Sequence, residues 1–132
     1  MSEVAKKHPL TEDKIEKLAK RLFKWCVKHD YWQDITIAYN GKSIGTYNPI
    51  TNEYYYGQDK YYENPSVDPK LWTEDFPSDA TICITMEGPF NHLMNSYSGT
   101  ASERKQVRKL FEDQELEIFV WNCYMYAYPK NK

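Results

Sequence analysis

The sequence lacks long apolar runs and lacks an excess of charge of either sign. No apolar run approaches the roughly 18 residues that a membrane-spanning helix needs, and the opening residues, MSEVAKKHPL, hold no apolar signal-peptide core. The 132 residues carry 17 Lys and Arg and 19 Asp and Glu, a formal net charge of −2, which argues against a dedicated nucleic-acid binder. We therefore expect a single soluble, cytoplasmic domain over residues 1–132, with no membrane partner.

The sequence also has few cysteine and histidine residues, the types that bind zinc most often. Its three cysteines, Cys26, Cys83 and Cys123, are widely spaced, and no CxxC pair or Cys–His cluster accompanies them. This pattern predicts no zinc site, no disulfide framework and no other cofactor. Because each cysteine lies in an apolar stretch, we interpret all three as small core residues.

Catalytic motifs are missing as well. The sequence contains no P-loop, no G-x-G-x-x-G and no G-x-S-x-G pattern. One alternative is a small enzyme of unknown reaction in which Glu87 and His92 act as an acid–base pair, since His titrates near neutral pH. The competing interpretation is a surface His92 and a Glu87 that caps the following helix. We expect no enzymatic activity.

Tyrosine, by contrast, is abundant, with 12 residues in the chain. Five of them lie in the segment YYYGQDKYY, residues 54–62, and a single helical or strand face cannot bury all five rings. Acidic residues are concentrated over residues 47–79, so the segment predicts an acidic, tyrosine-rich surface that meets a protein with a basic surface. The predicted partner-binding residues are Tyr54, Tyr55, Tyr56, Asp59, Tyr61, Tyr62 and Glu63.

The clearest element is a helix over residues 11–30. Thr11 is a suitable N-cap between Leu10 and Ile15, and apolar residues then recur at helical spacing. The outer face of this helix is basic, and we interpret it as a solvated face. The alternative is a nucleic-acid-binding or regulatory protein that uses this patch. Its residues are Lys17, Lys20, Arg21, Lys24 and Lys28.

The remaining pattern predicts strands and two more helices. Asn40-Gly41 indicates a type I′ turn between strands at 34–39 and 42–47, and Thr100 begins a capping box. Both faces of residues 116–128 are apolar, which favours one long or bent strand inside a sheet. The other expected segments are a tail at 1–9, a third strand at 53–56, a long acidic, Tyr-rich loop at 57–79, a strand at 80–86, and helices at 89–97 and 100–113.

These elements predict an α+β fold. We expect an antiparallel or mixed sheet of four or five strands, with an N-terminal helix and two further helices packed on it.

Part of the sequence resembles a recurring pattern. Residues 86–95, MEGPFNHLMN, are similar to F-E-G-P-L-x-x-x-L-N, a pattern of small proteins encoded on plasmids, phages and conjugative elements of Gram-positive bacteria. The relatives end in an aromatic-rich strand with a G-N-A-W core, which residues 121–124, WNCY, resemble without the Gly and with the Trp displaced. The matching positions in the first motif are Glu87, Gly88, Pro89, Met94 and Asn95.

What the resemblance implies is an inhibitor of host defence, of which anti-CRISPR proteins are one kind. Such proteins act by protein contact, and many present acidic surfaces to nucleic-acid-binding clefts. The function we predict is a non-enzymatic inhibitor encoded on a mobile element, acting on a CRISPR effector nuclease through the acidic, tyrosine-rich surface. A nucleic-acid partner is the less favoured prediction.

Overall fold

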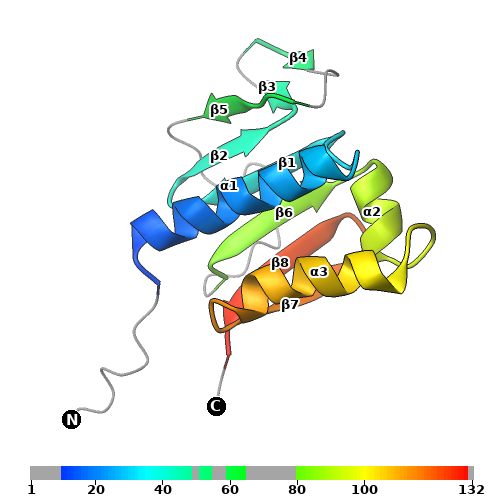
Figure 1. The fold of residues 1–132 in the computed structure, drawn as a ribbon. Coiled ribbons are helices and arrows are strands. Elements are labelled where there is room, and N and C mark those ends of the chain that lie inside the picture. Colours follow the sequence, from blue (N-terminus) through cyan, green and yellow to red (C-terminus); the bar gives the residue numbers. More distant parts are fainter. Residues whose placement is uncertain (1–9, 49–50, 55–58, 65–79, 131–132) are drawn as a thin grey trace.

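The computed structural model describes residues 10–48, 51–54, 59–64 and 80–130 (Figure 1). The predicted tail at 1–9 lies outside the described residues, as does most of the predicted acidic loop. Tyr55 and Tyr56, two of the seven predicted partner-binding residues, are also outside them.

The α+β prediction is confirmed, with an antiparallel main sheet. Six strands follow the order β5-β2-β1-β6-β8-β7, one more than the four or five expected. Two segments account for the larger sheet, because the C-terminal segment forms a hairpin and part of the predicted loop forms an edge strand. The strands are β1 (Ile35–Tyr39), β2 (Lys42–Gly45), β5 (Tyr62–Asn64), β6 (Ile82–Met86), β7 (Leu116–Trp121) and β8 (Tyr124–Pro129).

Two helices, α1 (Glu12–Lys28) and α3 (Ala101–Glu112), cover the same face of this sheet, and the short α2 (Pro89–Met94) lies at one end (Figure 1). Helices α1 and α3 begin at the predicted N-cap residues. The Thr11 side chain accepts a hydrogen bond from Lys14 N, and Thr100 and Glu103 form a complete capping box. No helix in the described part of the chain is both long and apolar enough to cross a membrane.

The main core lies between the helices and the sheet. Ile37 is paired with Ile44 on one side and with Ile84 on the other, and Ile84 is paired in turn with Met125. All four side chains are fully buried against the helices, together with Leu22 of α1. The apolar residues of one sheet face therefore hold the two helices in place by burial of apolar surface.

No described helix covers the other face of the sheet, which we call the helix-free face. A smaller buried cluster of Ala38, Cys83 and Tyr126 lies there. Phe119 and Trp121, on β7, are 55% and 61% exposed on the same face. The register Phe119↔Tyr126 and Trp121↔Tyr124 aligns these side chains across the two strands.

The prediction of one long strand over residues 116–128 is wrong. Asn122, with a φ of 55°, and Cys123 form a two-residue turn, so that the segment folds back on itself as the β7–β8 hairpin. The turn places Met125 opposite Val120 on the helix side, rather than on one face with Phe119 and Trp121. Residues of β7 are therefore covered on the helix side alone, because no described helix packs over Phe119 and Trp121 on the other face.

The predicted third strand is also placed differently. Glu53–Tyr54 forms β4, which pairs with β3 (Tyr47–Asn48) in a separate two-stranded sheet. The strand that extends the β1–β2 hairpin is β5, in the segment predicted to be loop. Asn40 and Gly41 have φ angles of 52° and 74°, as the predicted type I′ turn between β1 and β2 requires.

Candidate binding surfaces

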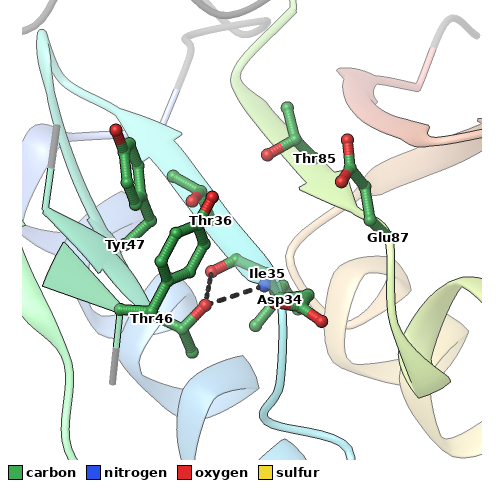
Figure 2. Close-up of a pocket in the computed structure, with 8 residues that line it drawn as sticks. Asp34, Ile35, Thr36, Thr46, Tyr47, Thr85 and Glu87 are labelled. Carbon is green, nitrogen blue, oxygen red and sulfur yellow. Dashed lines mark hydrogen bonds between the residues drawn. The ribbon is translucent and has the colours of Figure 1, made fainter. Parts of the chain in front are cut away.

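A hollow with a cavity volume of about 170 Å³ opens on the helix-free face, where β1 begins and β6 ends (Figure 2). Figure 2 shows Thr85 and Glu87 on one side of it, opposite Thr36 and Tyr47. We call this hollow the acidic pocket. Its lining residues are Asp34, Ile35, Thr36, Thr46, Tyr47, Tyr54, Thr85 and Glu87.

Sheet pairing positions the floor of the acidic pocket. Thr36 and Thr85 are direct partners across β1 and β6, which places their hydroxyl groups side by side. One step beyond the ladder, Glu87 N donates to Asp34 O at 2.9 Å, so the two acidic residues are adjacent although 53 positions separate them. Asp34 has a φ of 54°, a conformation that Asp and Asn tolerate better than most residues.

The remaining wall of the acidic pocket comes from the segment after β2. Thr46 is buried, and its Oγ1 accepts from Ile35 N at 3.1 Å and donates to Ile35 O at 3.3 Å. This double contact fixes the start of β3. Tyr47 and Tyr54, paired across β3 and β4, then contribute two rings whose centroids are 4.6 Å apart. The pocket thus combines carboxylates, hydroxyl groups and aromatic rings.

In the described part of the chain, no Lys, Arg or His forms an ion pair with either acidic residue of the acidic pocket. Within the described residues, neither Asp34 nor Glu87 forms an ion pair or accepts a side-chain hydrogen bond, whereas Glu16, Glu63, Glu103, Asp13 and Asp113 each do so. Asp34 is half-buried and Glu87 is exposed, so each would give a cation bound in the pocket a modest attraction that salt screens. The pocket is therefore chemically suited to an ammonium or guanidinium group.

The predicted acidic, tyrosine-rich surface is divided by the fold. Tyr54 is 52% exposed and lines the acidic pocket, and Asp59 is exposed as well. Tyr61 instead packs edge-to-face on Phe23 at 4.8 Å and contacts the main core. Tyr62 is half-buried in β5, and the next residue, Glu63, lies 3.9 Å from Lys42 Nζ.

The predicted basic patch on α1 is partly neutralised by the helix itself. Lys17 Nζ lies 3.2 Å from Asp13, and Lys20 Nζ lies 2.8 Å from Glu16, both one turn apart. Arg21, Lys24 and Lys28 are exposed. Pairing with carboxylates lowers the positive field that a phosphate backbone would meet on this face.

Glu87 and His92 do not form an acid–base pair in the structure. Within the described residues no ion pair joins them, and His92 is exposed beside the Tyr97 ring, with centroids 6.3 Å apart. The expectation that Glu87 caps α2 is wrong, because Gly88 is the N-cap and no side chain bonds to this helix end. No group of three described His, Cys, Asp or Glu residues is arranged to hold a metal ion.

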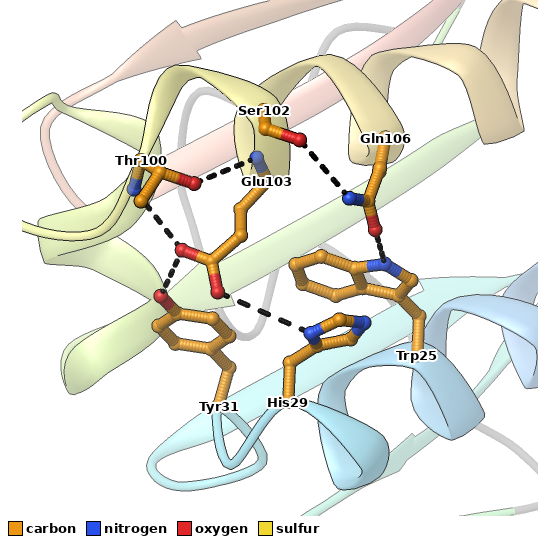
Figure 3. Close-up of polar contacts among 7 residues, drawn as sticks. All are labelled: Trp25, His29, Tyr31, Thr100, Ser102, Glu103 and Gln106. Atoms are coloured by element: carbon orange, nitrogen blue, oxygen red, sulfur yellow. Dashed lines mark hydrogen bonds and ion pairs between the residues drawn. The ribbon is translucent and has the colours of Figure 1, made fainter.

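A polar network that the sequence did not reveal joins α1 to α3 (Figure 3). Tyr31 donates to Glu103 at 2.8 Å, and His29 Nδ1 lies 4.0 Å from the same carboxylate. Trp25 Nε1 donates to Gln106 at 3.0 Å. The Tyr31 hydrogen bond lowers the pKa of Glu103, while burial and this bond raise the pKa of Tyr31 to about 12. The polar groups of this network form hydrogen bonds with one another, which is typical of a helix–helix contact rather than a reactive site.

The two motifs that carry the sequence resemblance lie in direct contact. The buried amide of Asn91 donates to Met86 O at 3.0 Å and to Asn122 O at 2.8 Å. Asn95, the last matching position, also donates to Asn122 O, at 2.9 Å. Residues 86–95 and 121–124 therefore form one structural unit, in which α2 holds the turn of the β7–β8 hairpin.

Comparisons of the chain with protein-family models, with curated proteins and with solved structures find no match.

Proposed function

We propose that the protein is a non-enzymatic binding protein that takes a Lys or Arg side chain of a partner protein into the acidic pocket. The observation that supports this proposal is that two acidic residues joined through their backbones, Asp34 and Glu87, line one hollow and form no ion pair with a described residue. A cation from a partner protein would neutralise these two carboxylates without a change in the backbone of the pocket.

The other lining groups favour the same ligand. Hydroxyl groups of Thr36 and Thr85 accept hydrogen bonds from an ammonium or guanidinium group. Tyr47 and Tyr54 present rings on which an alkyl stem or a guanidinium plane can pack. The pocket thus offers charge, hydrogen-bond acceptors and aromatic contact for one long basic side chain.

The chemistry of the pocket accords with an inhibitor that binds a basic protein surface. A cleft that binds nucleic acid exposes Lys and Arg side chains, and an acidic protein competes for them by electrostatic complementarity. Glu53, which is exposed and precedes the pocket residue Tyr54 in β4, would add to the attraction. A CRISPR effector nuclease remains the partner that the sequence resemblance implies.

The test compares two charge-matched double variants. Asp34→Asn with Glu87→Gln removes the pocket carboxylates, and Asn is compatible with the positive φ at position 34. Glu112→Gln with Glu115→Gln removes two exposed carboxylates elsewhere and changes net charge by the same amount. Binding of a fluorescein-labelled hexa-arginine peptide is followed by fluorescence anisotropy at low and high salt, with thermal melting to confirm folding.

We expect the pocket variant to lose about tenfold in affinity, equivalent to about 1.4 kcal/mol, and the control about twofold or less. An equal loss in both variants would show attraction by net charge alone and would contradict the proposal. Capture of partner proteins from a host lysate by the wild type, but not by the pocket variant, would extend the result from the peptide to a protein.

A further inference from the structure

The edge of the main sheet at β7 differs from the opposite edge. β7 has six residues, LEIFVW, whereas β5 at the other edge has three. Among the described strands β7 pairs only with β8, which leaves one side of its backbone without a neighbouring strand. Long edge strands are usually protected by Lys, Pro or a bulge, and β7 contains neither residue and has an unbroken register with β8.

The backbone groups that face outward can be identified. Lys130 N donates to Glu115 O at 2.9 Å, and a two-residue turn closes the hairpin between Trp121 and Tyr124. Hydrogen-bonded pairs alternate along an antiparallel ladder, so Glu117, Phe119 and Trp121 direct their N–H and C=O groups towards β8. The groups of Ile118 and Val120 point away from the sheet, and no described residue outside it bonds to them.

The side chains along this edge are apolar on both faces. Phe119 and Trp121, more than half exposed, lie on the helix-free face. Ile118 and Val120 lie on the helix side, where they are only partly buried against the main core. Glu117 is the one charged residue of the strand. An added strand would cover apolar surface on both faces and satisfy the free backbone groups.

We propose that β7 pairs antiparallel with β7 of a second copy of this chain, joining two sheets into one continuous sheet. The two-fold axis passes between the two Phe119 residues. Ile118 of each copy then exchanges both backbone hydrogen bonds with Val120 of the other, and Glu117 lies beside Trp121 rather than beside another Glu117. Self-pairing therefore avoids repulsion between the only charges on the strand.

The second copy is favoured as the occupant because the strand is complementary to itself in this register. Ile118 meets Val120 on the helix side, Phe119 meets Phe119 on the helix-free face, and pairing two identical edges closes the assembly as a dimer. The interface consists of one strand pair and four exposed rings. We expect it to bury less surface than the about 1,200–2,000 Å² that a stable complex buries. Dimerisation is therefore concentration-dependent, with a Kd in the micromolar range or weaker. The acidic pocket stays open, so this inference is independent of the proposed function.

The test is sedimentation velocity from about 1 μM to about 500 μM protein, with three variants. Phe119→Lys places two like charges opposite each other at the two-fold axis, and Val120→Pro removes an outward N–H while keeping the ladder with β8. Tyr97→Lys is the matched control, because Tyr97 is 77% exposed and lies outside the sheet. We expect the wild type and Tyr97→Lys to shift from monomer to dimer, and the two β7 variants to remain monomeric.

Amide hydrogen exchange of the wild type tests the register without any substitution. At high protein concentration the amides of Ile118 and Val120 become at least about tenfold more protected than at low concentration, since a tenfold change reflects about 1.4 kcal/mol. The amides of Glu117, Phe119 and Trp121, bonded to β8, change much less. A monomer at all concentrations, a dimer without this alternation, assembly beyond a dimer, or equal disruption by Tyr97→Lys would overturn the proposal.

Discussion

Asn91 shows how a single buried side chain connects two distant parts of the chain. It is 8% exposed, and its amide nitrogen bridges the end of β6 and the turn between β7 and β8. A buried carbonyl that loses its hydrogen-bond donor is left unsatisfied, which costs free energy of folding. The contact therefore fixes where the hairpin begins, and with it the position of the exposed strand β7.

Replacing Asn91 by Ala is expected to lower the free energy of unfolding by about 1–3 kcal/mol, because the carbonyl of Met86 loses its side-chain donor and that of Asn122 keeps only the bond from Asn95. Urea-induced unfolding followed by circular dichroism measures this. Asn95→Ala serves as the comparison. Its amide is more accessible, so water can replace the lost bond to Asn122 and the effect should be smaller. A larger loss in Asn95→Ala would contradict this account of the turn.

At the scale of elements, α1 is joined to the sheet by charge as well as by apolar contact. Glu16 accepts from Lys20 at 2.8 Å within the helix and from Lys42 of β2 at 2.9 Å. Hydrogen bonds from these two lysines lower the pKa of Glu16 to about 2. Asn40, in the turn after β1, adds a bond to Glu12 O at 2.9 Å. The start of α1 is thereby attached to the β1–β2 hairpin.

The stability that Glu16 contributes should depend on pH in one direction. Because its folded pKa is lower than its unfolded value of 4.5, the contribution is complete above pH 4.5 and is lost as pH falls towards about 2. Glu16→Gln should therefore lower the urea midpoint at pH 7 but leave it nearly unchanged at pH 2. Adding Lys42→Met should reduce the effect of Glu16→Gln at pH 7, and an undiminished effect would place the stabilisation elsewhere.

At the scale of the whole molecule, the two faces of the sheet have different roles. The helix side contains the main core and the network of Glu103 and Tyr31, both used to hold α1 and α3. The helix-free face contains the acidic pocket and, three strands away from β1, the exposed rings of β7. The acidic pocket and the exposed rings of β7 therefore lie on the same face of the molecule.

The reactivity of the three cysteine thiols depends on how deeply the whole fold buries each of them. Cys26 and Cys83 are 0% and 2% exposed, and burial raises the pKa of both thiols, that of Cys83 to about 12. Cys123 is only partly buried. Ellman's reagent at neutral pH should modify Cys123 at once and the other two only through global unfolding. Cys123→Ser should remove the fast phase, and rapid modification of a second thiol in the native protein would contradict the packing of α1 or β6.

Much of the fold could be predicted because its signals are local. The N-cap at Thr11, the turn at Asn40-Gly41 and the capping box at Thr100 each depend on residues within about four positions, and all three are confirmed. The C-terminal hairpin was missed because Asn122-Cys123 is a poor turn signal beside a run of strand-forming residues. Its turn is stabilised by Asn91 and Asn95 from α2, contacts that the local sequence does not contain.

The sequence by itself determined the helices, the first hairpin and the α+β class, because short-range hydrogen bonds and apolar periodicity decide them. Only the tertiary structure decided which rings are exposed and which acids adjoin. Tyr61, for example, packs on Phe23 of α1. Asp34 lies next to Glu87 because antiparallel pairing of β1 with β6 brings residues 53 positions apart into register. Such long-range pairings follow from how the whole sheet buries its apolar face, and no local pattern encodes them.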